Sequence, residues 1–565
     1  MKKILVAIVV LSLVLTTCLP TFALAGPIEY EGKFGYQIHN DQAYIVSIDH
    51  YTSGNVVIPS TLGGKPVSQI REYAFYERDR ITSVTIPQGV KEIHHNAFSN
   101  CISLKTVKMA DSVAVLHDSV FSGCTALEKI ELSSGIESLS RGMFSNCVSL
   151  KEINISEGIQ GIEERAFENC SSLRTITLPA SMQNVSGAAF NGCDMLEKIE
   201  VVPKSEYYTA KDGMLLSKNM EELCAILDNK ITEEVVIPSY VKKIGSSVFS
   251  GKEIIKSVKM HDDITEIGNS AFCCCCGLEN VTLPKNLKIL GGSAFSGCSN
   301  LKTIILPQEL SEIGGNAFSD CPELTQIDLP DGLTTIETGT FGYCTGLKSI
   351  EFPKKLTTIK ISAFAECTGL TSLNITKNLV DVDSQAFYGC INIRKISVEE
   401  GNKSFVFTNG GVFNTDGTIL YFVDGEDLTS YTIPQGVKTI TFKAFNHCTE
   451  LETLKMPISL KEISTEAFDG CKKLKEVYYE GGEVERDKLC MNLYWYMRKD
   501  KVNSPVWEAN WHFNDYPKEN PVVLENAPAT RETTTSSVWI IVVCALLGAA
   551  GVTAIVLKFI LKKKE

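Results

Sequence analysis

The chain has 565 residues and a formal net charge of −13, with 44% hydrophobic and 21% charged residues. This apolar content excludes a largely disordered protein, and the 41 Gly and 19 Pro are too few for a collagen. The acidic balance argues against nucleic acid as a partner, because phosphate contacts need a surplus of Lys and Arg. We therefore expect a folded protein that does not bind nucleic acid.

The N-terminal segment has the features of a secretory signal. A short basic start precedes an apolar run, and Ala23-Leu24-Ala25 fits the small-residue pattern of a cleavage site. We expect residues 1–25 to be a signal peptide. Lipidation of Cys18 is the alternative, but Thr17 stands where a lipoprotein signal prefers Gly, Ala or Ser.

The C-terminal region predicts a membrane anchor. Residues 517–537 are rich in Pro, Thr and Ser and are expected to form a stalk. Residues 538–557 carry no charge and are long enough to span a bilayer as a helix, and four Lys in residues 558–565 favour a cytoplasmic tail. Without the six Lys and one Glu of the two ends, residues 26–537 carry a net charge of −18. We expect a single-pass protein of the cell membrane, with its N-terminal body extracellular.

The body contains a repeat with a period of 23 residues. One Phe marks each unit, and in most units a Cys follows it after three residues. A fixed period in this range is typical of a solenoid, in which each unit buries its apolar residues against its neighbours. The fifteen marker residues are Phe75, Phe98, Phe121, Phe144, Phe167, Phe190, Phe249, Phe272, Phe295, Phe318, Phe341, Phe364, Phe387, Phe445 and Phe468.

Residues 301–321 show the content of one unit. Leu, Ile and Leu at spacings of three and two predict a short strand, which Pro307 ends because proline cannot donate to a continuing ladder. A second apolar pair follows, and Ala317 and Phe318 are expected to fill the side opposite the strand. Successive strands are expected to stack about 4.8 Å apart into a parallel sheet.

The consensus Leu-x-x-Ile-x-Leu-Pro-x-x-Leu-x-x-Ile-x-x-x-Ala-Phe-x-x-Cys resembles the BspA-like, or treponemal-type, leucine-rich repeats from Gly26 to about Glu476. The resemblance implies a leucine-rich-repeat right-handed solenoid, mainly β, with short parallel strands and irregular or short helical returns. It also implies a bacterial or protist surface protein that attaches to host matrix or to other cells, usually without enzymatic activity. It names no ligand.

Two intervals of similar sequence break the period, and turn signals such as Asp212-Gly213 and Asn409-Gly410 lie within them between apolar runs. We expect a hairpin insertion in each interval. The aromatic C-terminal segment is expected to close the solenoid, with a carbohydrate or partner site as the alternative. The body is thus divided into an N-terminal cap (26–70), repeats (71–476) with insertions near 200–236 and 397–432, and a C-terminal aromatic cap (477–516).

Most of the 20 Cys recur at the same position of the unit. Exported proteins rich in Cys normally form disulfides, but this spacing favours buried, reduced thiols that pack as small apolar groups. Disulfides between adjacent units are the alternative. This structural Cys ladder consists of Cys101, Cys124, Cys147, Cys170, Cys193, Cys275, Cys298, Cys321, Cys344, Cys367, Cys390, Cys448 and Cys471.

Other candidate clusters give weaker signals. In the run from Cys273 to Cys276 only Cys275 is on the ladder, so the other three are expected in a turn. They are either sequence variation that the turn tolerates or exposed thiols that cross-link copies of the protein. His94 and His117 are both four residues before a marker Phe and should stack in adjacent coils. Because this pair has no fixed third ligand, we expect polar surface and predict no metal site. No catalytic motif or cofactor fingerprint is present.

The outward strand positions, from Thr106 and Lys108 to Thr453 and Lys455, mix both charges and are rich in Ser and Thr. They identify no ligand, and the ligand-binding residues stay unknown. We expect a cell-surface module for adhesion that binds an extracellular protein or polysaccharide, with no catalysis and no cofactor. A structural or self-associating surface-coat protein is the alternative, and a surface hydrolase is less favoured because no catalytic domain is evident.

Overall fold

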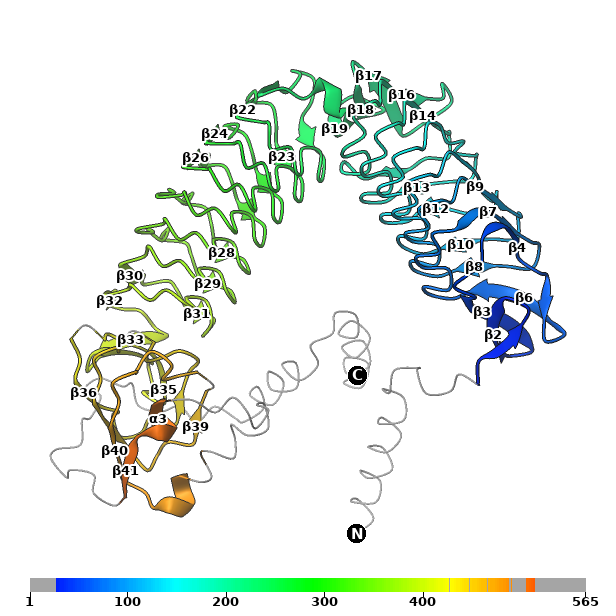
Figure 1. Cartoon of the computed structure of the whole chain (residues 1–565). Helices are drawn as coiled ribbons and strands as arrows, with labels where there is room; N and C mark the ends of the chain where they lie inside the picture. The colour runs from blue at the N-terminus through cyan, green and yellow to red at the C-terminus, as the bar shows by residue number, and fades with distance from the viewer. Residues whose placement is uncertain are drawn as a thin grey trace, which may run out of the picture.

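The computed structural model describes residues 27–425, 427–446, 448–464, 466–486, 489 and 505–513. Over these ranges the chain winds into a β-solenoid whose coils stack along an arch (Figure 1). The prediction of a mainly β solenoid with short parallel strands is confirmed. The predicted signal peptide, stalk, membrane helix and cytoplasmic tail lie outside the described residues.

The longer strands follow the outer, convex side of the arch and form what we call the outer ladder (Figure 1). Where two of them pair, they run in parallel, and in regular coils each residue faces the residue 23 positions later. The strands of the outer ladder are β4 (Gly54–Val57), β7 (Ile81–Ile86), β9 (Thr106–Met109), β11 (Lys129–Glu131), β14 (Thr175–Leu178), β16 (Lys198–Val201), β20 (Glu234–Val236), β22 (Ser257–Lys259), β24 (Asn280–Thr282), β26 (Thr303–Ile305), β30 (Ser372–Ile375), β32 (Lys395–Val398), β36 (Ser430–Thr432), β38 (Thr453–Met456) and β40 (Glu476–Tyr479).

The outer ladder is interrupted, whereas the sequence predicted a continuous sheet. In the coils around Ile153, Ile327 and Ile350 the outer side has no regular strand, and one isolated bridge remains between Thr303 and Gln326. Single backbone hydrogen bonds still join these coils, such as the one from the N–H of residue 348 to the carbonyl of residue 325 at 3.3 Å. The outer surface is therefore a series of short sheets.

Two-residue strands follow the inner, concave side of the arch and form the inner ladder (Figure 1). In each of them the second residue is apolar and, with the exception of half-buried Val185, buried, while the first residue faces outward in most coils. These strands are β8 (Glu92–Ile93), β10 (Val115–Leu116), β12 (Ser138–Leu139), β13 (Gly161–Ile162), β15 (Asn184–Val185), β21 (Lys243–Ile244), β23 (Glu266–Ile267), β25 (Ile289–Leu290), β27 (Glu312–Ile313), β28 (Thr335–Ile336), β29 (Thr358–Ile359), β31 (Asp381–Val382), β37 (Thr439–Ile440) and β39 (Glu462–Ile463).

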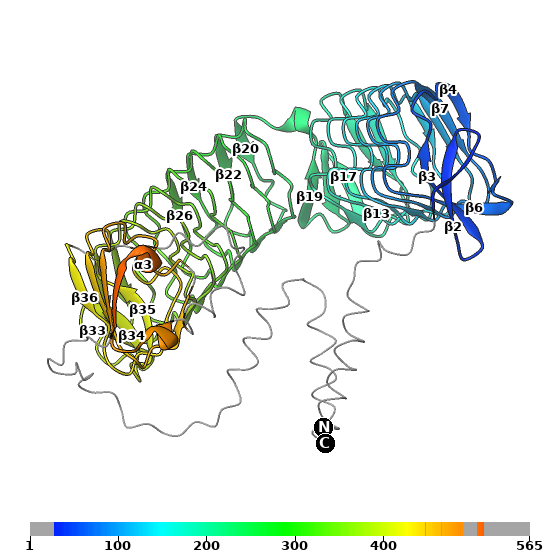
Figure 2. The ribbon, with the colours of Figure 1, turned by 60° about the horizontal axis from the view of Figure 1, so that its bottom comes forward.

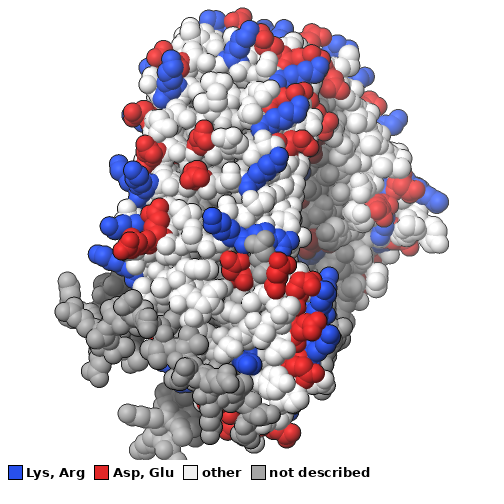
Figure 3. Space-filling view, turned by 90° about the vertical axis from the view of Figure 1, so that its left-hand side faces the viewer, with Lys and Arg blue, Asp and Glu red and all other residues white. Residues whose placement is uncertain are grey.

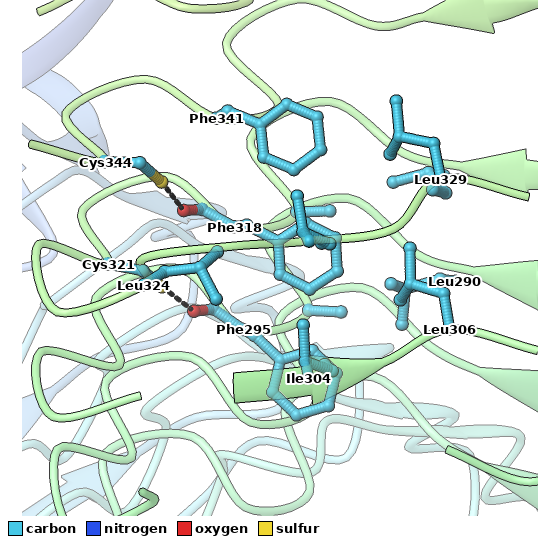
Figure 4. Packing of buried hydrophobic residues seen from close by; sticks show 14 of the residues in the cluster. Leu290, Phe295, Ile304, Leu306, Phe318, Cys321, Leu324, Leu329, Phe341 and Cys344 are labelled. Atoms are coloured by element: carbon cyan, nitrogen blue, oxygen red, sulfur yellow. Dashed lines mark hydrogen bonds between the residues drawn. The ribbon is translucent and has the colours of Figure 1, made fainter. Parts of the chain in front are cut away.

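The Ala-Phe-x-x-Cys segment closes each coil between the two ladders. The buried ring of Phe318 stacks on Phe295 and on Phe341, with centroid distances of 6.0 and 5.6 Å (Figure 4). The backbone is left-handed two residues before and two residues after the Phe, at Asn316 and Asp320, with φ of 56° and 57°. This conformation favours Gly, Asn and Asp, which explains why small polar residues recur there.

Each interval that breaks the period contains a three-stranded antiparallel sheet, and we call these sheets the first and second module. The last strand of each module then pairs in parallel with the inner ladder. Figures 1 and 2 show the first module at the bend between the two arms of the arch. The elements are β17 (Tyr208–Lys211), β18 (Met214–Ser217), β19 (Glu222–Ile226) and the 3₁₀ helix η1 (Asp228–Lys230), and then β33 (Phe405–Thr408), β34 (Gly411–Asn414) and β35 (Ile419–Val423).

The modules divide the apolar interior into three clusters. In the first module Leu215 packs into the N-terminal cluster and Leu216 into the middle cluster. In the second module Val412 packs into the middle cluster and Phe413 into the C-terminal one. Consecutive side chains of a strand point to opposite faces, so the middle strand of each module is buried on both sides. Each module therefore continues the solenoid while it separates two cores.

Both ends of the described solenoid are covered by additional strands. At the N-terminus β1 (Glu29–Glu31), β2 (Phe34–His39) and β3 (Gln42–Ile48) form an antiparallel sheet, which continues in parallel through β6 (Lys65–Ile70) to the inner ladder. A short strand, β5 (Thr61–Leu62), pairs with β6.

At the C-terminal end, α3 (Pro505–Glu508) leads into β41 (Asn510–Phe513), which pairs in parallel with β40. The ring of Trp511 meets the buried ring of Tyr479 edge-on at 6.0 Å. Aromatic residues of the predicted C-terminal cap thus pack on the last coil.

Candidate functional site

The thirteen cysteines of the Cys ladder are all buried and unpaired in the described structure. In twelve of them the Sγ atom donates a hydrogen bond to the carbonyl of the marker Phe in the preceding coil, 26 residues earlier. Cys321 donates to Phe295 at 3.2 Å, and Cys344 donates to Phe318 at 3.1 Å (Figure 4). This contact needs a thiol hydrogen, so the geometry suits reduced cysteines.

Burial also suppresses the ionisation of these thiols. It raises the pKa of Cys101, Cys170 and Cys275 from the ordinary value of 9.0 to about 12. Because the thiolate is the reactive form of cysteine, the ladder residues are expected to be inert in the folded protein. Their role in the structure is packing, and nothing about them indicates catalysis.

Alkylation should distinguish the ladder from the turn cysteines. When the folded full-length chain, purified in a mild detergent, is treated with iodoacetamide at pH 8, we expect labelling of exposed Cys274 and no labelling of Cys321 or Cys344. Peptide mapping by mass spectrometry reads out each site, and urea-unfolded protein serves as the fully labelled control. Labelling of the ladder peptides in folded protein at the rate of Cys274 would contradict buried, reduced thiols.

The remaining residues of the Cys273 to Cys276 run lie in a turn, as expected. Cys274 is exposed and has a left-handed φ of 56° at a position where the next coil has Gly297. Its Sγ atom is 3.6 Å from that of half-buried Cys273. The sulfur of Cys276 instead approaches the carbonyl of Gly297 at 3.5 Å. Cross-linking of copies through this turn stays a prediction.

Most outward positions of the outer ladder are exposed, and others, such as Thr453 and Lys455, are half-buried. Many of their neighbours form ion pairs between adjacent coils, such as Lys302 with Glu279 at 2.9 Å. On the outer side of the C-terminal arm, charges of both signs lie next to one another (Figure 3). Exposed pairs of this kind contribute at most about 1 kcal/mol each. This surface therefore shows no single-sign patch that selects a ligand.

The inner ladder has a groove of about 610 Å³ over strands β25, β27 and β28. Its floor contains Gly291, Gly292, Gly314 and Gly315. A Cβ atom on Gly291 would lie 2.5 Å from the backbone nitrogen of Asn269. A Cβ atom on Gly314 would lie 2.4 Å from the backbone nitrogen of Gly292. Glycine is required there by the close approach of the coils, and the missing side chains leave the groove open.

Polar side chains surround this groove. Exposed Asn269, Ser311, Glu312 and Thr334 lie along it, and half-buried Glu337 closes one end. The Glu337 carboxylate forms an ion pair with Lys360 at 2.7 Å, whereas no Lys or Arg is among the lining residues. The groove thus offers hydrogen-bonding groups and negative charge.

His94 and His117 stack in adjacent coils, as the spacing predicts, with ring centroids 4.8 Å apart. The structure adds Glu92, whose carboxylate lies 2.7 Å from His117 Nε2. The pKa of His94 is lowered to about 4, mainly by burial and next by the nearby Arg71 guanidinium. Its imidazole is therefore neutral at pH 7. The sequence interpretation missed Glu92, although its place two residues before His94 puts both on one face of a strand.

Comparisons with known proteins match the solenoid. A family model described as BspA type leucine rich repeat region, with six copies of the repeat, matches residues 68–197, 226–348, 334–410 and 421–491. No curated protein matches the chain. Within the described ranges no helix combines the length and the apolar character that a membrane span requires.

Solved structures of bacterial proteins are similar to the chain. A leucine rich cell surface protein from Faecalibacterium prausnitzii is 26% identical, with 66% of this chain and 95% of that chain covered and a TM-score of 0.36. A leucine-rich repeat protein from Eubacterium ventriosum is 23% identical, with coverages of 68% and 99% and a TM-score of 0.48. The pneumococcal vaccine antigen PcpA is 20% identical, with coverages of 67% and 95% and a TM-score of 0.42.

The family model and the geometry agree on the repeat unit. The matched ranges contain the marker Phe residues, the Cys ladder and, except for β4 and β16, the strands of both ladders. They also make up more than half of the 565 residues. The chain therefore belongs to the family of BspA-type leucine-rich-repeat proteins.

Proposed function

We propose that this chain is a cell-surface interaction module that binds an extracellular protein through the groove of the inner ladder. In this proposal residues 26–537 lie outside the cell, the apolar segment 538–557 predicted from the sequence anchors them, and the module performs no catalysis. Membership of the repeat family supports an interaction role.

The groove over β25, β27 and β28 is the observation that carries this proposal. It lies on the concave side, where an extended ligand can contact several coils at once. Its floor is backbone at Gly291 and Gly314, and its edges carry amide, hydroxyl and carboxylate groups. Such a surface can form hydrogen bonds along an extended peptide.

Charge favours a basic segment of the partner. Glu312 is exposed at the groove, and no Lys or Arg is among the lining residues, although Glu337 is paired with the nearby Lys360. The whole chain is acidic, with a formal net charge of −13. Complementary charges speed association and select among partners, although they add less to affinity. Binding should therefore weaken as the salt concentration rises.

The proposal is tested with an array of matrix proteins, mucins and polysaccharides, probed with the full-length chain in a mild detergent. We expect binding to proteins that contain basic segments. Ser311→Arg places a bulky cation at an exposed edge of the groove and should lower the affinity for such a protein at least about 10-fold. Surface plasmon resonance measures the dissociation constant.

Thr303→Arg is the matched control, because Thr303 is exposed in the same coil but on the outer ladder. This variant should bind like the unchanged chain. A blank array, binding confined to polysaccharides, or equal loss of affinity in both variants would each contradict the proposed protein-binding groove.

A further inference from the structure

Three metal-ligating side chains converge on the inner ladder near the N-terminal end of the arch. Glu92 belongs to β8, and His94 follows that strand directly. Strand β8 pairs in parallel with β10, with Glu92 facing Val115 and Ile93 facing Leu116. His117 follows β10 and continues this register opposite His94. The two imidazoles and the carboxylate therefore lie on the same face of two adjacent coils.

The distances between their ligand atoms suit a small divalent cation. The two oxygens of Glu92 lie 2.7 Å from His117 Nε2 and 3.6 Å from His94 Nε2. All three potential ligand atoms lie within 4.8 Å of one another. In a tetrahedral zinc site with bonds of 2.0–2.2 Å, ligand atoms are separated by about 3.3 Å. Small rotations of the three side chains are enough to reach that spacing.

The surroundings hold the ligands in place and leave a path for the ion. The Gln69 side chain donates to the Glu92 carboxylate at 2.8 Å, and its amide oxygen lies 3.2 Å from His94 Nε2. Exposure of the three ligand side chains ranges from 17% to 29%, so solvent reaches the cluster. The ring of His95 also lies beside that of His117, at a centroid distance of 4.7 Å.

One neighbour opposes a bound cation. Nη1 of Arg71 lies 3.3 Å from His94 Nε2, on the side of the ring that the ligand atom faces. Arg71 is exposed, so its long side chain can move into solvent. A metal ion must displace this guanidinium, and the charge of Arg71 should weaken the binding. A variant that lacks the Arg71 guanidinium should therefore bind the metal ion more tightly.

We propose that Glu92, His94 and His117 form a binding site for a divalent transition-metal ion, for which Zn²⁺ is the best match. Two imidazole nitrogens and one carboxylate oxygen are a donor set that zinc uses with a fourth position open to water. Hard cations such as Ca²⁺ and Mg²⁺ prefer oxygen ligands and should bind poorly here. The bound ion would cross-link two adjacent coils.

Zn²⁺ itself is the probe, in isothermal titration calorimetry of the metal-free, full-length chain at pH 7.5 in a mild detergent. Thiols also bind zinc, so all proteins carry Cys273→Ser, Cys274→Ser and Cys276→Ser, and also Cys490→Ser, since Cys490 lies outside the described residues. We expect one equivalent of Zn²⁺ to bind. His117→Ala should lower the affinity about 100-fold or more, since it removes one of three ligands.

Three further variants separate metal ligation from a general effect on the fold. Gln69→Ala should weaken Zn²⁺ binding several-fold, because it removes the hydrogen bond that orients the Glu92 carboxylate. Arg71→Ala should strengthen binding several-fold. Glu312→Gln is the matched control, because Glu312 occupies the same position in β27 without imidazole neighbours, and it should leave the affinity unchanged.

Circular dichroism first establishes that each variant is folded. Co²⁺ gives a second readout, because its visible absorption under nitrogen and oxygen ligation lacks the charge-transfer band of a thiolate complex. No Zn²⁺ binding by the parent protein, unchanged binding by His117→Ala, or a thiolate band would overturn the proposal. Zn²⁺ binding that is lost with His117 and strengthened without Arg71 would support it.

Discussion

Raising the pH from 8 to about 10 is expected to unfold the reduced protein. Burial is the largest cause of the raised pKa of eleven thiols of the Cys ladder. At Cys367 the hydrogen bond with Cys390 is the largest cause, and burial is the next. In the unfolded chain the same twelve thiols would ionise near the ordinary pKa of 9.0. The folded state therefore holds protons that the unfolded state releases.

The sign of the effect follows from this difference. Since the folded pKa lies above the unfolded one, the contribution of each thiol to stability is complete below pH 9 and is lost as the pH rises toward 12. At pH 10, one unit above the unfolded pKa, each thiol is expected to cost about 1.4 kcal/mol. Twelve such losses add up to about 17 kcal/mol, which is as large as the whole free energy of unfolding of a typical domain.

Urea unfolding of the full-length chain at pH 8, 9, 9.5 and 10, with a reducing agent present, measures this dependence. Cys321→Ala should lower the number of protons released on unfolding by one, because it removes one ladder thiol. Cys274→Ser is the control, since Cys274 is exposed, and it should leave the slope with pH unchanged. Equal unfolding midpoints at pH 8 and pH 10 would contradict the prediction.

Asp228→Ala is expected to lower the free energy of unfolding by about 3–5 kcal/mol, because it leaves a buried charge without a partner. Lys252 occupies the ladder position of its coil, three residues after Phe249, where thirteen other coils have Cys. The Lys252 side chain is only 9% exposed, and its ammonium group is paired with the Asp228 carboxylate. The other oxygen of Asp228 accepts the N–H of Gly192 at 2.7 Å.

Asp228 belongs to η1 of the first module, so this contact joins the module to the coils on both sides. Lys252→Cys should restore the residue type of the ladder, and the double variant should recover most of the stability that Asp228→Ala loses. Urea unfolding of the four proteins in a double-mutant cycle measures the coupling.

Glu233→Ala is the matched control for Asp228→Ala. It breaks an ion pair with Lys256 of the adjacent coil, but both of those side chains are more than 60% exposed. We expect this variant to lose less than about 1 kcal/mol. If Asp228→Ala is no worse than Glu233→Ala, or if Lys252→Cys does not rescue it, the buried pair does not stabilise the junction.

The cluster of Glu92, His94 and His117 shows which contacts local sequence patterns can predict and which they cannot. The stacking of His94 on His117 follows from the period alone, because residues 23 apart occupy equivalent positions of adjacent coils. Glu92 has no equivalent acidic residue in the next coil, where Val115 stands, so the repeat gave no reason to examine it. The groove near Gly291 was also missed, because a close approach between coils is visible only when they are stacked.

The 23-residue unit of this protein can be predicted from local spacing. Its period places Phe, Cys and the apolar strand residues at fixed positions, and each contacts its counterpart one coil away, so local spacing is enough to predict the stacked rings and buried thiols. Where the period fails, the contacts between residues are visible only in the folded structure. The pairing of Lys252 with Asp228 and the division of Leu215 and Leu216 between two cores are contacts between non-equivalent positions. No period specifies such contacts, because they depend on how each module turns the chain between two stacks.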